Sequence, residues 1–394
     1  MNTFNGGKIK TETKIGGMLF FVALFLFYVK YTFDCSGLLF KNAYINSALV
    51  GLSVALPMIK IVMQRYTPAR LIITAVITAA VCASCLAGGN YLFLNGFIFI
   101  LAMQDVDLNK LVRFGFRYKT AMISIHVLCY IFVYFTNPSS INYVYRIGGA
   151  PRHYFFIGHA NMFTAFLVWT TFEYVFLNYE KIKWYNIFII WAINLLFYNF
   201  TDSNTGMAVL AVFTALVVLD KFAKEIFNKI SAVLAKYIYL VCSLFFSWIA
   251  IIYTRLGPSQ KTIWYRIDRF FTGRLWYGAY TYETYGVTFF GRILSTPDKI
   301  FWENRWMDGF MVFDNHYHGN LFGLGIIHLI LVSLILLIYG KKMDAKERII
   351  VICFSLYGAM EAYITNVFIC FALLIIGKYI YLDKIKRNKI KVNG

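Results

Sequence analysis

The sequence predicts an all-α polytopic membrane protein with about twelve transmembrane helices and one large extracytoplasmic loop. Of its 394 residues, 60% are apolar and 14% are charged, whereas a soluble domain is about 45–50% apolar and about 25% charged. Apolar runs of the length needed to cross a bilayer core of about 30 Å recur along the chain. The aromatic content of 19% also suits a protein with two interfacial aromatic belts.

The apolar runs define twelve expected spans, or eleven if the last two, which are nearly continuous, form one. They cover residues 16–33, 44–63, 71–88, 90–103, 120–136, 154–177, 184–200, 204–219, 237–254, 320–339, 349–364 and 367–382. Because they are spread over the whole chain, residues 1–394 are expected to form a single integral membrane domain.

Basic residues orient this map through the positive-inside rule. With the N-terminus inside, most of the 38 Lys and Arg residues fall in inner segments, among them Lys110, Arg113, Arg117 and Lys119. Both termini are therefore expected to be cytoplasmic. The net charge of +19 then follows from topology and from attraction to anionic lipid, and we expect no nucleic-acid partner.

The outer segments are enriched in arginine relative to lysine. Their lysines are Lys30, Lys41, Lys261 and Lys299. Their arginines are Arg146, Arg152, Arg255, Arg266, Arg269, Arg274, Arg292 and Arg305. A guanidinium is a planar fork that binds phosphate or carboxylate with two hydrogen bonds. The enrichment points to an anionic ligand at the outer face, with pairing to acidic loop residues or to lipid headgroups as the alternative.

One outer segment, residues 255–319, is much longer than other connections. Loops of more than about 12–15 residues are uncommon and are usually functional or disordered. This segment is rich in Trp, Tyr, Phe and Arg. These aromatic side chains suit stacking on sugar rings and anchoring at the membrane interface equally well. A short amphipathic helix along the membrane surface is expected from the apolar residues Ile267, Phe270, Phe271 and Leu275. Arg266 and Arg269, and Arg274 if the helix continues, would then share one stripe.

The loop ends in a polar run, Asp314-Asn315-His316-Tyr317-His318, directly before a predicted span. Asp and His side chains act as general bases and acids. On an extended stretch Asp314, His316 and His318 would face one side. That alternation permits a metal site, but no fourth ligand is evident, and we expect neither a metal nor another cofactor.

Further polar residues lie at the ends of the sixth and eighth predicted spans. Arg152, His159 and Asn161 surround the start of the sixth span, and His159 and Asn161 are too close in sequence to share a helix face. In the link at residues 201–206, Ser203 or its neighbour is expected to cap the following helix.

Two acids, Glu173 and Glu361, are predicted to lie inside spans. Ionisable residues at such positions are costly and are functional candidates by default. The alternative is a hydrogen bond that holds a neighbouring helix, and the sequence favours this simpler role.

Four segments together resemble the Wzy-type polysaccharide polymerases of the O-antigen ligase-like superfamily. Residues 152–161, with Arg152, Gly158, His159 and Asn161, resemble its Arg…Gly-Phe-x-His-Pro-Asn element, and residues 201–206 its Thr-x-Ser-Arg-Thr-Gly link. The pairs Gly273-Arg274 and Phe290-Gly291 resemble elements of its outer loop. Asp314-Asn315-His316-Tyr317, followed by Gly323-Leu-Gly325, is similar to its closing Asp-Asn-x-Tyr element.

The sequence also departs from the family pattern. Ala160 stands where the family has Pro, and Phe156 where it has Gly. Asn204 replaces a common Arg, so that position lacks a phosphate-binding candidate. Related O-antigen ligases have His-Asn in place of Asp314-Asn315, and this difference favours a polymerase over a ligase.

The resemblance implies a glycosyltransferase that joins oligosaccharide repeat units, carried on undecaprenyl pyrophosphate, into capsular polysaccharide, exopolysaccharide or O-antigen. The enzyme would lie in the bacterial cytoplasmic membrane, with its active site outside, and would have a flippase and a chain-length regulator as candidate partners. The same resemblance assigns pyrophosphate binding to Arg152, Arg266, Arg269 and Arg274, and proton transfer to Asp314, His316 and His318. Supporting positions would be His159, Asn161, Ser203, Asn315 and Tyr317.

Two other functions remain open. One is a ligase of the same superfamily, which would transfer the glycan to a glycolipid or wall polymer. The other is a transporter or flippase for lipid-linked oligosaccharides, which would make no bond. Many transporters show two related halves with broken spans, and the sequence shows no convincing internal repeat.

Overall fold

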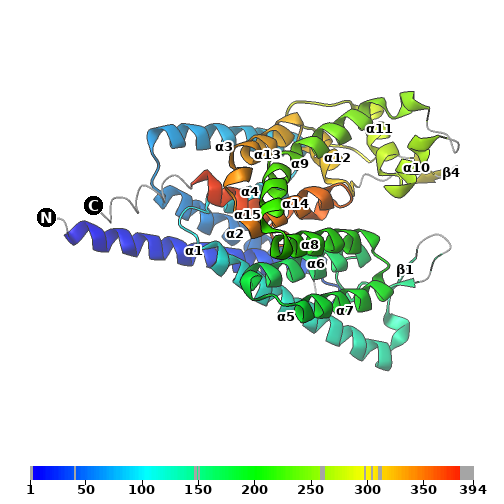
Figure 1. The fold of residues 1–394 in the computed structure, drawn as a ribbon, viewed down its shortest axis with the longest axis horizontal. Coiled ribbons are helices and arrows are strands. Elements are labelled where there is room, and N and C mark those ends of the chain that lie inside the picture. Colours follow the sequence, from blue (N-terminus) through cyan, green and yellow to red (C-terminus); the bar gives the residue numbers. More distant parts are fainter. Residues whose placement is uncertain are drawn as a thin grey trace. The chain divides into compact units, whose positions relative to one another are not determined.

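A computed structural model describes residues 3–39, 41–145, 149, 151–257, 262–296, 299–302, 305–308 and 313–381. These residues form mainly helices, with two short hairpin-like sheets (Figure 1). The α-helices are α1 Thr3–Cys35, α2 Ala43–Met63, α3 Pro68–Gly88, α4 Tyr91–Leu101, α5 Leu108–Thr136, α6 Ala160–Leu177, α7 Trp184–Thr201, α8 Asn204–Phe222, α9 Lys224–Ile252, α10 Ile263–Phe270, α11 Arg274–Tyr285, α12 His316–Gly323, α13 Ile326–Tyr339, α14 Ala345–Gly358 and α15 Ala372–Ile380.

Short 3₁₀ turns and strands complete the described chain. The 3₁₀ turns are η1 Pro138–Ser140, η2 Tyr179–Lys181, η3 Thr254–Leu256, η4 Gly340–Lys342 and η5 Ala362–Thr365. Strand β1 (Val144–Tyr145) pairs antiparallel with β2 (Pro151–Arg152), and β3 (Lys299–Trp302) pairs antiparallel with β4 (Arg305–Asp308). The strands belong to connections between helices, so the prediction of an α-helical architecture is confirmed for the body of the protein.

Within the described residues, six helices are long and apolar enough to cross a membrane. They are Lys14–Cys35 within α1, and α2, α3, α5, α8 and α9. Their outer surfaces carry many exposed apolar side chains; on α3 these include Leu71, Ile72, Ile73 and Val76. Exposed apolar side chains in such number mark a contact with a membrane or a partner, and together with the six apolar helices they are compatible with an all-α membrane protein.

The remaining predicted spans correspond to shorter or more polar helices. Helix α4 has 11 residues, α13 and α14 have 14 each, and α15 has 9, whereas a straight crossing needs about 20. Helices α6 and α7 have 18 residues each but carry Glu173 and Asn194 in their interiors. The count of twelve spans is therefore not confirmed and stays a prediction.

Three predicted boundaries are wrong, two of them for a backbone reason. Helix α6 begins at Ala160 rather than at residue 154, because Phe155, Phe156 and Gly158 have φ values of 50°, 59° and 53°, which a right-handed helix excludes. The span predicted at 320–339 is broken at Gly325, whose φ is 83°. The span predicted at 349–364 ends at Gly358, so Glu361 lies between α14 and η5.

The chain is grouped into two compact units, each built from distant segments of sequence. Unit 1 contains Met1–Arg65, Asn95–Val218 and Asn366–Gly394, and unit 2 contains Tyr66–Leu94 and Leu219–Thr365. Each unit is described by itself below. The single integral membrane domain expected from the sequence stays a prediction.

The core of unit 1 is aromatic. Phe368 contacts Tyr28 of α1, with ring centroids 4.5 Å apart, and Phe166 of α6, with centroids 5.0 Å apart. Phe172 of α6 stacks on Phe213 of α8 at 3.9 Å. Aromatic pairs of this kind contribute beyond the area they bury, and here they hold α1, α6 and α8 around the segment that follows residue 365.

Within this core lies an ion pair between α5 and α6. The Nζ atom of Lys119 is 2.6 Å from Oε1 of Glu173, and the two side chains are 0% and 1% exposed. Nζ also donates a hydrogen bond of 3.0 Å to the carbonyl oxygen of Ile369. Lys119 therefore lies inside a long helix, and its predicted place in an inner loop is wrong. Its charge is tolerated there because Glu173 and a carbonyl oxygen compensate it.

Unit 2 is organised around α9. Tyr239 and Phe246 of α9 stack on Phe354 of α14 and on Tyr317 of α12, with centroids 5.8 and 5.4 Å apart and ring planes within 5°. The Tyr317 hydroxyl also donates to the carbonyl oxygen of Ser355, at 2.7 Å. In Figure 1, α10, α11 and β4 lie together near one end of α9, so the described part of the predicted long loop forms mainly helices and short strands.

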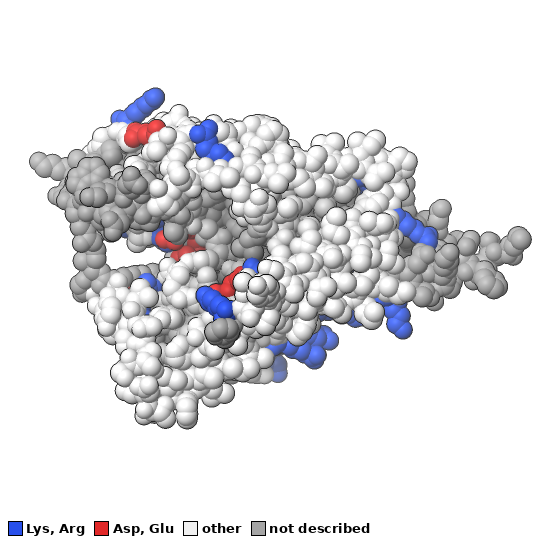
Figure 2. Space-filling view, turned by 180° about the vertical axis from the view of Figure 1, so that it is seen from behind, with Lys and Arg blue, Asp and Glu red and all other residues white. Residues whose placement is uncertain are grey.

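The surface agrees with a membrane protein of high positive charge. Figure 2 shows that uncharged residues make up most of the described surface on the face in view, with Lys and Arg side chains projecting at several places. The sequence has 38 Lys and Arg residues against 19 Asp and Glu. Orientation in the membrane and the position of the termini stay predictions.

The buried pair leads to a stability prediction. Lys119→Met should lower the free energy of unfolding by about 3–5 kcal/mol, because it leaves the Glu173 charge buried without its partner. The double variant Lys119→Met/Glu173→Leu should recover most of that loss. The measurement is the thermal unfolding midpoint in detergent; equal losses for the single and double variants would contradict the explanation.

Candidate functional site

A sharp corner joins α10 to α11 and positions Arg274. Thr262 caps α10, its Oγ1 accepting from the N–H of Tyr265 at 3.4 Å. After the helix ends, Thr272 and Gly273 take φ values of 52° and 80°, and α11 begins at Arg274. A left-handed backbone suits glycine and strains other residues. This explains why a glycine directly precedes Arg274 at the start of α11.

Asp268 stabilises this corner from inside. Its Oδ1 accepts hydrogen bonds from the N–H groups of Leu275 (2.9 Å) and Trp276 (3.3 Å) at the start of α11, and its Oδ2 accepts from the Tyr253 hydroxyl at 3.1 Å. Burial raises the pKa of the Asp268 carboxyl above its ordinary value, and these hydrogen bonds act in the opposite direction. Asp268 thus caps α11 across the turn and ties it to the end of α9.

Asn315 fixes the start of α12 in a similar way. Its Oδ1 caps the helix by accepting from the N–H of His318 at 2.9 Å. Its Nδ2 donates to the carbonyl oxygen of Ala359, at the end of α14, over 2.7 Å. Because Asp314 precedes Asn315 directly, this bond brings Asp314 to the segment that contains Glu361.

Arg274 joins these two acids. Its Nη2 is 3.2 Å from Oδ2 of Asp314 and 3.5 Å from Oε1 of Glu361. The side chains of Arg274, Asp314 and Glu361 are 10%, 43% and 0% exposed. Nη1 also donates to the carbonyl oxygen of Phe271 at 3.1 Å and to Oγ1 of Thr272. We call Arg274, Asp314 and Glu361 the Arg274 cluster.

The Arg274 cluster has one cation and two carboxylates of different character. Glu361 is enclosed, and an enclosed carboxylate is tolerable because a guanidinium compensates it. Asp314 is oriented by the same guanidinium yet keeps much of its surface open. An oriented and accessible carboxylate can accept a proton from a bound hydroxyl group. Sequence reasoning chose Arg274 and Asp314, but it placed Glu361 inside a span and did not connect it with them.

The predicted arrangement in which Asp314, His316 and His318 face one side of an extended stretch is not present. Helix α12 begins at His316 and winds the two rings apart. His316 lies 3.1 Å from the Tyr239 hydroxyl and 3.0 Å from Oγ1 of Thr365. His318 Nε2 lies 3.0 Å from the carbonyl oxygen of Phe246. Both rings are enclosed and already hydrogen-bonded.

Burial also keeps these rings neutral. It lowers the pKa of His316 well below its ordinary value and that of His318 to about 4, although backbone hydrogen bonds raise the latter. A neutral imidazole held by fixed partners has no access to a substrate hydroxyl. The geometry therefore favours Asp314 over either histidine as a proton acceptor.

Close packing of α11 on α12 sets the distance between Arg274 and Asp314. A Cβ atom added at Gly278 would lie 2.3 Å from Cε1 of His318. A glycine is thus required at this crossing, because any larger side chain would push the two helices apart or displace the ring. Tyr317, buried beside His318, stacks on Phe246, which His318 also contacts.

The predicted amphipathic helix is present only in part, as α10, which ends at Phe270, whereas Leu275 is buried in α11. Arg266 and Arg269 of α10 are exposed and lie three residues apart, so they share a face. Ile263 and Phe270 of the same helix are 67% and 74% exposed, as expected for a helix in contact with a membrane surface. Arg274 does not share their stripe, because the turn at residues 271–273 redirects the chain.

A second arginine site lies in unit 1. Arg152 is buried, and its Nε donates to the carbonyl oxygen of Thr201 over 2.7 Å. Its Nη2 donates to Oδ1 of Asn161 over 2.6 Å. The predicted neighbours Arg152 and Asn161 are thus brought together with the 201–206 link, and Arg152 ties the start of α6 to the end of α7.

The other predicted residues of unit 1 take local roles. His159 caps α6, its Nδ1 accepting from the N–H of Asn161 at 3.2 Å. Ser203 is buried directly before α8, and the neighbouring Asn204 accepts from the Tyr198 hydroxyl over 2.7 Å. These contacts hold the helix ends around Arg152.

Two of the four resembling segments meet in unit 2. The N–H of Arg292, next to Gly291, donates to the carbonyl oxygen of Phe322 at 3.1 Å, and the N–H of Ile326, next to Gly325, donates to that of Thr288 at 3.2 Å. A Cβ at Gly325 would lie 2.3 Å from the backbone nitrogen of Gly291. The sequence singled out both glycines but gave no sign that they contact each other.

Some of the outer basic residues named from the sequence are not described by the structure. Arg146 and Lys261 lie outside the described residues, as do the side chains of Lys299 and Arg305. Within the described part of the chain, no group of three or more His, Cys, Asp or Glu side chains is arranged to hold a metal ion.

Comparisons of the chain with models of known protein families, with curated proteins and with solved structures found no match. The family resemblance therefore rests on the four sequence segments alone.

The pKa of His318 gives a pH prediction. When the pKa of a histidine is lower in the folded state than in the unfolded state, its contribution to stability is fully present at a pH above the unfolded-state pKa of about 6.5. That contribution is lost as the pH falls toward 4. The loss should reach about 3 kcal/mol. His318→Gln should make the fall of the unfolding midpoint between pH 7 and 4.5 less steep, while His316, whose pKa burial also lowers, keeps its own contribution; an unchanged slope would contradict the assignment.

Gly278→Ala should separate α11 from α12 and cost about 1–3 kcal/mol of stability, as overpacking usually does. The matched control is Gly51→Ala in α2, where an added Cβ meets nothing within 4 Å. Thermal unfolding in detergent compares the two. Equal midpoints would show that the helix crossing tolerates a methyl group.

Proposed function

We propose that this protein is a membrane glycosyltransferase that polymerises undecaprenyl-pyrophosphate-linked oligosaccharide repeat units at the outer face of the bacterial cytoplasmic membrane. The observation that carries the proposal is the Arg274 cluster, in which one guanidinium orients the accessible carboxylate of Asp314. The membrane-protein fold and the four segments resembling Wzy-type polymerases support the same function.

In the proposed reaction the hydroxyl group of the acceptor sugar attacks the anomeric carbon of the donor glycan. Asp314 takes the hydroxyl proton as the new glycosidic bond forms. The bond between the anomeric carbon and the pyrophosphate oxygen breaks, and the lipid pyrophosphate leaves with the electron pair. The energy stored in that linkage drives transfer, so the proposal requires neither a nucleotide nor a metal.

Negative charge develops on the leaving pyrophosphate and has to be stabilised by fixed cations. Arg266 and Arg269 are the candidates that best suit this role in unit 2, because both are exposed on an amphipathic helix. Arg274 is engaged by two carboxylates, so we assign it the positioning of Asp314, and pyrophosphate binding through its remaining donors stays a hypothesis. Arg152, already bound to Thr201 and Asn161, is assigned the shaping of the 152–161 segment.

The role of Asp314 predicts the effect of removing its charge. Asp314→Asn preserves size but removes the base, and general-base catalysis contributes roughly 10²–10⁴-fold to a rate. In a polysaccharide-producing strain this variant should stop chain growth and accumulate single lipid-linked repeat units. Polymer length on a gel and lipid-linked intermediates by mass spectrometry are the readouts.

The matched control is Glu283→Gln, which neutralises an exposed acid on α11 and should leave polymer length unchanged. Normal polymer made by the Asp314→Asn variant at normal protein levels would remove Asp314 from the mechanism. A ligase would instead leave free polymer unattached to its acceptor, and a transporter would strand repeat units on the inner leaflet. Either pattern would replace the proposed function.

A further inference from the structure

Basic residues gather in unit 2 where the first half of α9 meets the connection between α13 and α14. Residues 224–236 and 340–348 contain seven Lys and Arg residues and three acids. Two of these acids, Asp344 and Glu347, cap α14, and each accepts a hydrogen bond from the backbone N–H of the other. Positive charge therefore exceeds negative charge in this part of unit 2.

Backbone packing brings three of the lysines together. A Cβ atom added at Gly340 would lie 2.8 Å from the carbonyl oxygen of Ala235 and 2.9 Å from Cα of Lys236, so the turn η4 lies directly against α9. Lys341 and Lys342 follow Gly340 in η4 and are thereby held beside Lys236. We call Lys236, Lys341 and Lys342 the Lys236 patch.

Two lysines of the Lys236 patch have no acidic partner. Lys341 and Lys342 are exposed, and Lys236 is half-buried. Among the described residues, no carboxylate forms an ion pair with Lys236 or Lys341. Like charges held side by side repel each other, and a bound anion relieves that repulsion.

Two tyrosine rings lie next to these ammonium groups. The Nζ atom of Lys236 is 4.7 Å from the ring centroid of Tyr237, and that of Lys342 is 5.0 Å from the ring centroid of Tyr339. The charge of Lys341 also acts on the Tyr237 hydroxyl. Tyrosines are enriched where a protein meets the membrane–water interface, and lysines there extend their ammonium groups toward the headgroups.

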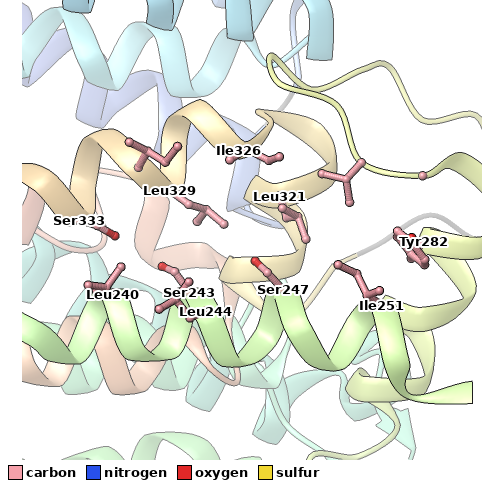
Figure 3. Close-up of a pocket in the computed structure, with 13 residues that line it drawn as sticks. Leu240, Ser243, Leu244, Ser247, Ile251, Tyr282, Leu321, Ile326, Leu329 and Ser333 are labelled. Atoms are coloured by element: carbon pink, nitrogen blue, oxygen red, sulfur yellow. The ribbon is translucent and has the colours of Figure 1, made fainter. Parts of the chain in front are cut away.

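Apolar surface begins directly beside the Lys236 patch. Leu244 of α9 and Ile338 of α13 are 62% and 58% exposed, and α9 is among the helices long and apolar enough to cross a membrane. Leu240 and Ser333 stand at the same end of an apolar groove between α9 and α13 (Figure 3), and Leu240 lies one helical turn beyond Lys236. A soluble anion gains nothing from such a surface, whereas a lipid presents a charged headgroup together with hydrocarbon.

We infer that the Lys236 patch binds the phosphate headgroup of an anionic phospholipid. Clusters of Lys and Arg at the end of a membrane-crossing helix attract anionic lipids. Arg348 of α14 adds to this charge: its Nη2 donates to Oδ1 of Asn228 in α9, and its Nε has no hydrogen-bond partner among the described residues. In the orientation predicted from the sequence, this lipid belongs to the inner leaflet. The inference does not depend on the proposed enzymatic function.

Titration of the full-length protein in detergent with phosphatidylglycerol, read by native mass spectrometry, tests this inference. The wild type should bind phosphatidylglycerol several-fold more tightly than phosphatidylcholine, whose headgroup has no net charge. Lys236→Gln/Lys341→Gln should weaken phosphatidylglycerol binding about 10–30-fold, because each lysine near a lipid surface contributes about fivefold. The matched control Lys110→Gln/Lys181→Gln removes the same charge from exposed positions in unit 1 and should leave the affinity nearly unchanged.

Equal weakening by the two double variants would show that overall charge, and not the Lys236 patch, attracts the lipid. Equal affinities of the wild type for the two phospholipids would also overturn the inference. Displacement of phosphatidylglycerol by an equal concentration of inorganic phosphate would assign the patch to a free anion instead of a lipid.

Lysine acetylation of the wild type in nanodiscs gives a second readout that needs no variant. Lys236, Lys341 and Lys342 should react several-fold more slowly in discs that contain phosphatidylglycerol than in discs of phosphatidylcholine alone. Lys110 and Lys181 serve as internal references and should change less. Equal protection at all five positions, or none at the Lys236 patch, would contradict the inference.

Discussion

The ion contacts of Arg274 are the interaction on which the candidate site depends. One guanidinium lies 3.2 Å from the Asp314 carboxylate and 3.5 Å from that of Glu361. Without it, two acids would face each other at a helix break, one of them fully enclosed, at a large cost in desolvation and repulsion. The same contact leaves Asp314 oriented but accessible, which is the property a proton acceptor needs.

The rest of unit 2 can be understood as the support for that contact. Asp268 caps α11 and directs its first residue, Arg274, toward α12. Asn315 caps α12 and reaches the end of α14, and Gly278 allows the two helices to approach closely. Each of these residues acts on the position of a charge rather than on the charge itself.

The sequence predicted the class of the protein and part of the site. Apolar runs gave the helices because a membrane span needs about 20 apolar residues wherever it occurs, and the loop chemistry singled out Arg274 and Asp314. Helix ends were less predictable. The left-handed backbone at Phe156, where the resembling family has glycine, shortens α6 through a conformation that side-chain hydropathy does not encode.

Contacts between distant segments could not be predicted either, because side-chain hydropathy does not encode them. Lys119 was predicted in an inner loop although it pairs with Glu173, and Glu361 was predicted in a span although it pairs with Arg274. A single sequence shows that a charged residue interrupts an apolar run, but not which opposite charge meets it. His316 and His318 were chosen for their chemistry, and their enclosure follows from packing against α9 that only the fold defines.

The most direct test of the proposed activity uses purified protein in proteoliposomes supplied with undecaprenyl-pyrophosphate-linked repeat units, without any other protein. The account predicts glycan chains of two or more repeat units and release of one undecaprenyl pyrophosphate for each bond formed. Unchanged repeat units, in a preparation that is folded and correctly oriented, would contradict it.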